Sequence, residues 1–294
     1  MTRSMATFYG NGVPDTNLRG PIQLAGARRL LLYNGSVRSW LALCVCVFSS
    51  LGAAAPAAAL SLDQLTDEEA ALRLSAMQSL SPMVDERKKA GDAPLITFEE
   101  LYRPLNPEQV RFLEKFRQVD PAALGGSSRR LPVPTGRESF VRLDRQVVRK
   151  EGNPVRLDAQ YLPAEAYRAY ERMMAAMEKD LGKRLLVESG YRSPAYQLYL
   201  FLFYMPKHGY SVRETNRHVA LPGCSEHGSP AYQAIDFITP EGVNGEDRPE
   251  EFEELQEYGW LHARAGEFGF HLSYPRGGES AFEPWHWHWE KEKR

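Results

Sequence analysis

The sequence predicts an α+β fold: a small, mostly antiparallel sheet flanked by helices and preceded by a helical N-terminal region. Three observations predict it. Residues 61–124 are charged and carry helix-capping signals, residues 163–182 have an amphipathic helical pattern, and short strand-like runs alternate with further helices after residue 183. The chain has 294 residues, which allows one domain with extra segments or two small domains.

The uncharged run from Ser39 to Leu62 follows three arginines and contains Ala-x-Ala sites. A basic flank, an apolar stretch and small residues of this kind are typical of a secretory signal. We therefore interpret residues 1–59 as a signal peptide with a long basic part, removed near Ala59. The expected protein is exported, periplasmic or extracellular, without stable membrane association. The alternative is an inner-membrane anchor formed by residues 39–60.

The helical region at 60–130 carries no residues that predict chemistry. Thr66 with Glu69, and Thr97 with Glu100, have the spacing of capping boxes. We interpret this region as an accessory region or a prosegment. The stretch GGSSRRLPVPTG at 125–136 is the best linker candidate, so the catalytic domain is expected to cover 131–294.

The elements of the second region follow from local patterns. Residues 140–148 show partial strand alternation, and Pro163 and Gly182 delimit the amphipathic helix, whose tyrosines and methionines predict core packing. The remaining expected elements are a strand at 184–189, a helix after Pro194, an acidic helix near Pro249, and strands at 268–275 and 285–289.

Charge and cysteine content exclude some classes of protein. Lys and Arg total 36 against 38 Asp and Glu, so no excess of basic residues predicts binding to nucleic acid. Cys44 and Cys46 lie in the segment expected to be removed, which leaves Cys224 without an intramolecular disulfide partner. All seven histidines lie at or after His208, which points to metal chemistry in the second region.

Three segments hold the residue types of a metallopeptidase: SGYRS at 189–193, SEH at 225–227 running on to Asp236, and EPWH at 283–286. Two histidines and one carboxylate are a common ligand set for catalytic zinc, and a glutamate that is not a ligand can act as general base. On a strand over 285–289, His286 and His288 would share one face. Glu283 would then have to lie on a bend.

These segments resemble the LAS group of zinc peptidases, in particular the VanY-type D-alanyl-D-alanine carboxypeptidases. The blocks SGYRSPAYQ, PGCSEH, AIDF, FGFHLSYP and FEPWHWHWE follow the family order. The resemblance implies Zn²⁺ held by His227, Asp236 and His286. It also implies that Glu283 is the base, and that Arg192 holds the substrate and stabilises the oxyanion. Gln197 and Ser225 match positions that line the family's substrate site.

The sequence departs from the family pattern in three places. Eight residues instead of the usual six separate His227 from Asp236, so the loop is expected to bulge. His288 stands where arginine is frequent and is either a group behind the ligands or a competing ligand. Cys224 precedes Ser225 and is interpreted as inert packing, with metal binding or oxidation as alternatives. Structural roles are expected for the other histidines, at 208, 218, 262 and 271.

The function implied by the resemblance is removal of the terminal D-Ala from peptidoglycan stem peptides. A D,D-dipeptidase or a wall endopeptidase of the same fold is the alternative within the enzymes. Outside them, a non-catalytic wall-binding module and a membrane-anchored interaction protein stay open.

Overall fold

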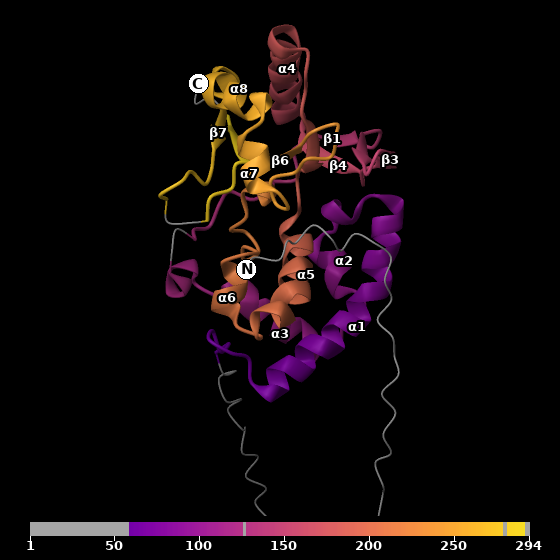
Figure 1. The fold of residues 1–294 in the computed structure, drawn as a ribbon. Helices are drawn as coiled ribbons and strands as arrows, with labels where there is room; N and C mark the ends of the chain where they lie inside the picture. Colours follow the sequence, from indigo (N-terminus) through magenta and orange to yellow (C-terminus); the bar gives the residue numbers. More distant parts are fainter. Residues whose placement is uncertain (1–58, 126–127, 279–280, 292–294) are drawn as a thin grey trace, which may run out of the picture. The chain divides into compact units, whose positions relative to one another are not determined.

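The computed structural model describes residues 59–125, 128–278 and 281–291 (Figure 1). Residues 1–58 lie outside these ranges. They include Cys44 and Cys46 and nearly all of the predicted signal peptide and of the alternative membrane anchor. Within the described ranges, no helix combines the length and the apolar composition that a membrane crossing requires. The interpretation of residues 1–58 therefore stays a prediction.

The predicted helical region is present, and capping residues set its boundaries. Its helices are α1 (Asp67–Ala90), η2 (Ala93–Leu95), α2 (Phe98–Tyr102), α3 (Pro107–Gln118) and η3 (Pro121–Leu124). Thr66 and Glu69 exchange hydrogen bonds at the start of α1, and Thr97 and Glu100 do so at α2, so both predicted capping boxes are confirmed. Each box satisfies backbone N–H groups that have no partner within the helix.

Two small antiparallel ladders come before the longest helix of the second region. The first pairs β1 (Phe140–Leu143) with β4 (Gln160–Pro163), and the second pairs β2 (Val147–Lys150) with β3 (Asn153–Arg156). The β2–β3 hairpin turns at Glu151 and Gly152, with φ of 51° and 79°. Left-handed backbone at both central residues is what a tight two-residue hairpin turn requires.

Helix α4 (Ala164–Leu181) confirms the predicted amphipathic helix, with Pro163 before it and a left-handed Gly182 after it. Its buried face consists of Ala166, Ala169, Tyr170, Met173, Met174 and Met177. These side chains belong to one core together with α8 (Gln256–Arg264) and the sheet described next. The stripe of tyrosine and methionine is therefore core packing, as predicted.

The central sheet is small and antiparallel throughout, which confirms the predicted fold class. Its strand order is β5 (Leu186–Ser189), β6 (Tyr232–Ile238), β8 (His286–Glu290) and β7 (Phe270–Leu272). The chain passes from β6 to β7 through α7 (Pro249–Glu253), α8 and η6 (Ala265–Phe268). On β8, Trp287 and Trp289 are buried in the core that includes α4. The alternation along β8 therefore directs His286 and His288 to the other face of the sheet.

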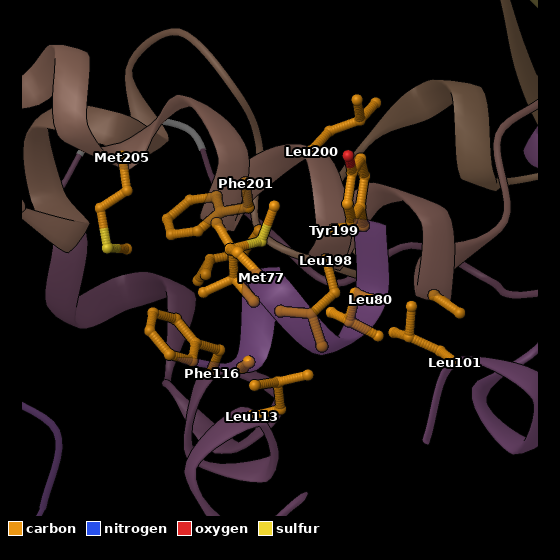
Figure 2. Packing of buried hydrophobic residues seen from close by; sticks show 14 of the residues in the cluster. Met77, Leu80, Leu101, Leu113, Phe116, Leu198, Tyr199, Leu200, Phe201 and Met205 are labelled. Atoms are coloured by element: carbon orange, nitrogen blue, oxygen red, sulfur yellow. The ribbon is translucent and has the colours of Figure 1, made fainter. Parts of the chain in front are cut away.

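A second core lies between the N-terminal helices and α5 (Pro194–Tyr204), as Figure 2 shows. Met77, Leu80, Leu113 and Phe116 pack there with Phe201, and each of these side chains is at least nine-tenths buried. Helix α5 is apolar nearly all round, a pattern that requires burial on every side. The boundary between residues 60–130 and 131–294 stays a prediction, but the two parts share this core.

Polar contacts fix both ends of α5 to the N-terminal helices. The buried Arg73 side chain donates to the carbonyl oxygens of Leu202 and Phe203, where α5 ends. At the other end, the Ser193 N–H donates to Pro94 O at 2.8 Å, and the Ser193 hydroxyl donates to Ile96 O. The segment before α2 therefore holds the SGYRS turn directly.

We expect Ser193→Ala to lower the free energy of unfolding by about 2–4 kcal/mol. The change leaves the Ile96 carbonyl without its donor, and it removes the side-chain cap that accepts from Tyr196 N at 3.0 Å. Urea denaturation measures the loss. Ser79→Ala is the control, because that half-buried hydroxyl donates to Ser75 O of its own helix and has only a long hydrogen bond, 3.4 Å, from Gln109 Nε2 of α3. A loss below about 0.5 kcal/mol, the range of ordinary surface changes, would contradict this account.

Candidate metal centre

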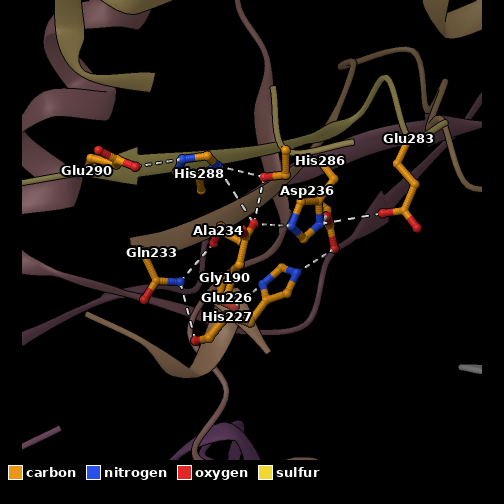
Figure 3. A network of polar contacts seen from close by, with 11 residues as sticks. Gly190, Glu226, His227, Gln233, Ala234, Asp236, Glu283, His286, His288 and Glu290 are labelled. Atoms are coloured by element: carbon orange, nitrogen blue, oxygen red, sulfur yellow. Dashed lines mark hydrogen bonds and ion pairs between the residues drawn. The ribbon is translucent and has the colours of Figure 1, made fainter. Parts of the chain in front are cut away.

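The structure brings His227, Asp236 and His286 together. His227 lies on η5 (Glu226–Gly228), Asp236 on β6 and His286 on β8. One ligand atom of each lies within 4.8 Å of the others, and all three side chains are largely buried (Figure 3). Asp236 and His286 are directly opposite each other in the antiparallel β6–β8 pair. Sheet register thus joins two residues that are far apart in the sequence.

In each of the two imidazoles, the ring nitrogen that faces away from the candidate metal position is near an oxygen acceptor. His227 donates from Nδ1 to Gly190 O at 2.7 Å, which leaves Nε2 to face Asp236 Oδ2 at 3.2 Å. His286 has Nε2 at 3.1 Å from Glu226 Oε2, and its Nδ1 is 2.8 Å from Asp236 Oδ1. Metal-bound histidines in proteins almost always have such an acceptor on the nitrogen that is not a ligand.

The charges around His286 favour a bound cation. Burial by itself would lower the pKa of His286, but the charge of Asp236 and the hydrogen bonds to Asp236 and Glu226 raise it to about 10. Burial would raise the pKa of Glu226, yet the bond and charge of His286, with the Ser273 hydroxyl, lower it to about 2. A buried imidazole between two carboxylates needs a positive charge, from a proton or from a metal ion. The donor set therefore fits a divalent cation of the zinc type.

Glu283 lies beside the three ligand candidates. Its Oε2 is 3.8 Å from His286 Nδ1, and its backbone N–H donates to Tyr274 O at 3.1 Å. The His286 N–H donates to Glu283 O at 3.2 Å, so the bend predicted before β8 is present. Burial raises the pKa of Glu283 to about 7. The charge of His286 lowers this pKa, and the charge of Asp236 raises it further. A carboxyl with this pKa can both take up and release a proton near neutral pH.

Arg192 is attached to the same group of residues through its backbone, whose N–H donates to His227 O at 3.0 Å. Its guanidinium charge contributes to the lowered pKa of His227, after burial, which is the larger cause. The Arg192 Nε atom is buried and has no hydrogen-bond partner in the described part of the chain. The Arg192 guanidinium is thus close enough to the candidate ligand His227 to change its pKa.

Gln197 and Ser225 are buried side chains of the SGYRSPAYQ and PGCSEH segments. Gln197 is buried on α5 and donates to Ala220 O at 2.8 Å, while its Oε1 is buried without a partner among the described residues. Ser225 is buried directly before η5. The described residues show no hydrogen bond or ion pair between either side chain and the three ligand candidates. A role in lining a substrate site stays a prediction for both.

His288 and Cys224 do not belong to the three-residue group. His288 Nδ1 is 2.8 Å from Ser273 Oγ, and its Nε2 is 3.3 Å from Glu290 Oε1, so it lies behind Glu226 rather than at the candidate metal. Cys224 packs against the core around α5, and burial raises the pKa of its thiol. The reading of Cys224 as packing agrees with this environment.

The longer spacing between His227 and Asp236 is taken up before the strand. A turn closes with the Tyr232 N–H donating to Ser229 O at 2.9 Å, and β6 begins at Tyr232. From there to Asp236 the register with β8 is continuous. The expected bulge therefore lies in the turn at 228–231, and Asp236 keeps its place opposite His286.

Glu226 was not identified from the sequence, nor were the two glutamates Glu188 and Glu246 near Asp236. Glu226 directly precedes a candidate ligand, which was the available signal, but nothing local shows that its side chain reaches β8. The charge of Asp236 raises the pKa of both Glu188 and Glu246, and the charge of Glu188 also raises that of Glu246, so the three carboxylates lie near one another. Burial is the main cause that raises the pKa of Glu188 to about 7 and that of Glu246 to about 8.

Glu188 gives a prediction on pH. The pKa of Glu188 is about 7 in the folded protein and about 4.5 in the unfolded chain. Between these two pH values the unfolded chain has lost the Glu188 proton while the folded protein still holds it, so unfolding becomes more favourable as pH rises. Glu188 should therefore contribute about 1–2 kcal/mol to the loss of unfolding free energy of the metal-free protein as pH rises from 5 to 8, in addition to the losses from Glu246 and Glu283, whose pKa values are also raised. Glu188→Gln should show a smaller loss, because an amide does not titrate in this range, and its oxygen can still accept from Asn244 Nδ2. Urea denaturation at both pH values, with chelator present, measures the difference; identical pH profiles would contradict the assignment.

Comparison with known proteins gives a consistent result. Residues 159–292 match the family model described as VanY, D-alanyl-D-alanine carboxypeptidase. The chain is 31% identical over 135 residues to YodJ of Bacillus subtilis (strain 168), a protein with a provisional carboxypeptidase name. That alignment covers 45% of this chain and 47% of YodJ, so the chain spans less than half the length of this curated relative.

Two solved structures are similar at a lower level. The first is the LdcB LD-carboxypeptidase, with 25% identity, coverage of 59% of this chain and 79% of that chain, and a TM-score of 0.43. The second is the vancomycin-resistance D,D-pentapeptidase VanY with Zn(II), with 21% identity, coverage of 57% and 88%, and a TM-score of 0.37. Residues 159–292, which match the family model of the VanY D-alanyl-D-alanine carboxypeptidases, contain all three residues of the candidate metal centre.

Proposed function

We propose that the protein is a zinc-dependent D-alanyl-D-alanine carboxypeptidase that removes the terminal D-Ala from peptidoglycan stem peptides. The observation that carries this proposal is the buried group of His227, Asp236 and His286 with the Glu283 carboxylate beside it. The match of residues 159–292 to the VanY family model supports the same activity and substrate class.

Zn²⁺ is the proposed metal because two imidazoles and one carboxylate are its usual protein ligands in hydrolases, with a further position open to water or substrate. His227 would bind through Nε2 and His286 through Nδ1, since the other nitrogen of each is already held by an oxygen. When bound, the ion acts as a Lewis acid that polarises a carbonyl group and makes water more acidic.

The roles of the chain's own residues follow from their charges and positions. Glu283 takes a proton from the attacking water and delivers it to the amine of the departing D-Ala, which its pKa of about 7 permits. Arg192 binds the substrate carboxylate or stabilises the oxyanion, because a guanidinium can donate two parallel hydrogen bonds. Gln197 and Ser225 are proposed to line the substrate site.

The test is hydrolysis of a synthetic stem pentapeptide that ends in D-Ala-D-Ala. Zinc-loaded protein should release free D-Ala and a tetrapeptide, and the chelator-treated protein should release neither. Mass spectrometry identifies the products. Absence of turnover in a sample that holds stoichiometric zinc would overturn the carboxypeptidase and leave a wall-binding module as the alternative.

Two related activities are distinguished by mass spectrometry of the products from two further substrates. A D,D-dipeptidase would cleave free D-Ala-D-Ala, and a wall endopeptidase would convert cross-linked muropeptides to monomers. The turn at 228–231 is longer than the family pattern and adjoins His227, so it is the feature of this chain that bears on the choice. We also propose that the protein is exported, because its substrate class lies outside the cytoplasm and residues 1–59 have the pattern of a signal peptide.

A further inference from the structure

We propose that Glu226 is a positioning residue that fixes the tautomer and orientation of His286 for metal binding. The inference rests on the proposed function only in assigning a metal to this centre. Neither the family motif nor the ligand set assigns Glu226 a role.

The contacts of Glu226 reach from one ligand segment to another. Glu226 is on η5, directly before His227, and its Oε2 lies 3.1 Å from Nε2 of His286 on β8. The Ser273 hydroxyl donates to the same Oε2 at 2.6 Å. Only 16% of the Glu226 side chain is exposed, so water competes little for this carboxylate. Figure 3 shows the dashed contacts that join these side chains.

The tautomer of His286 depends on this carboxylate. A neutral imidazole carries one proton, and His286 has an acceptor at each nitrogen: Asp236 Oδ1 at 2.8 Å from Nδ1 and Glu226 Oε2 at 3.1 Å from Nε2. With the proton on Nδ1, His286 would donate to Asp236 and its lone pair would point away from the centre. With the proton on Nε2, it donates to Glu226, and the Nδ1 lone pair faces the metal position beside Asp236.

Glu226 therefore competes with Asp236 for the single proton of His286. When Glu226 holds that proton on Nε2, both Asp236 and Nδ1 are free to bind the cation. Ser273 keeps the Glu226 carboxylate in place, and its hydroxyl oxygen is also 2.8 Å from Nδ1 of His288. His288, at a position where the family frequently has arginine, thus helps to orient the Ser273 hydroxyl toward Glu226.

Zinc affinity, measured by competition with a chromophoric chelator, tests the proposal directly. Glu226→Ala should weaken zinc binding by about 10–100-fold, the range found when such partners of metal-bound histidines are removed. Glu226→Gln keeps an oxygen acceptor and should lose clearly less. Glu290→Gln is the matched control, because this exposed carboxylate contacts Nε2 of His288, the ring nitrogen that does not face Ser273, and should leave zinc affinity unchanged.

A second readout follows the tautomer itself. In ¹⁵N-detected NMR spectra of the metal-free proteins above about pH 10, where the His286 imidazole is neutral, His286 should carry its proton on Nε2 in the native protein and shift toward Nδ1 in Glu226→Ala. If Glu226→Ala does not fold, Ser273→Ala replaces it, with an expected loss of zinc affinity that is smaller but in the same direction.

The outcomes separate this inference from the proposed function. Native zinc affinity in Glu226→Ala, or an unchanged His286 tautomer, would overturn the role of Glu226 while leaving the carboxypeptidase proposal intact. A native protein that binds no zinc would instead overturn the metal centre itself. Weaker zinc binding in Glu226→Ala with native binding in Glu290→Gln is the result that supports the proposal.

Discussion

Glu283→Gln is expected to keep zinc and to lose about 10²–10⁴-fold in kcat, the contribution of a positioned general base. The amide has nearly the shape of the carboxylate but cannot take up the proton of the attacking water. Because Glu283 is not one of the three ligand candidates, its Oε2 being 3.8 Å from His286 Nδ1, metal affinity should change little. Zinc content and D-Ala release from a stem pentapeptide, measured on the same sample, check both parts.

The control for this experiment is Glu290→Gln, an exposed glutamate at the end of β8, the strand that follows Glu283; this variant should keep native turnover. A Glu283→Gln protein that hydrolyses the peptide at the native rate would remove Glu283 from the chemistry. Loss of zinc together with turnover would make Glu283 a ligand instead of a base.

Asp236→Ala is expected to have the largest effect, with loss of stoichiometric zinc and of detectable turnover. The Asp236 carboxylate contacts both candidate histidines, His227 Nε2 at 3.2 Å and His286 Nδ1 at 2.8 Å. Its removal takes away one of the three proposed ligands, so zinc affinity should fall by more than the roughly 10–100-fold that hydrogen-bond partners of the ligands contribute. Chelator competition measures the affinity, and metal analysis of the purified protein gives the occupancy.

The matched control is Asp247→Ala, because this exposed aspartate follows β6 in the loop that contacts Glu188 through Asn244. It should bind zinc with native affinity. An Asp236→Ala protein that retains one tightly bound zinc would show that the ion sits elsewhere and would end the proposed arrangement.

The local structure of this protein could be predicted largely from the sequence. Thr66 with Glu69 sets the start of α1 and Thr97 with Glu100 that of α2, because each capping box acts within four residues. Pro163 and Gly182 enclose α4 for the same reason, since proline restricts the backbone before a helix and glycine tolerates the left-handed residue after it. The candidate ligands were also proposed from the sequence, through their resemblance to a family motif.

Only the tertiary structure decided what these residues contact. The register of β6 against β8 places Asp236 opposite His286, and the longer turn at 228–231 leaves that register unchanged. The side chain of Glu226 crosses from η5 to β8, and the segment before α2 holds Ser193 at the start of α5. None of these contacts joins residues at a helical or strand period, so no local pattern predicts them.

The sequence by itself thus determined the long helices, the strands of the central sheet and the residue types available for catalysis, because these depend on interactions between near neighbours along the chain, whereas the strands β3 and β4 were not predicted. The tertiary structure decided which side chains share one buried centre and which nitrogen of each histidine is left for a metal. The physical reason is that sheet register, burial and competition for a single proton depend on groups that lie more than 30 residues apart, as with His227 and Gly190 or His286 and Glu226.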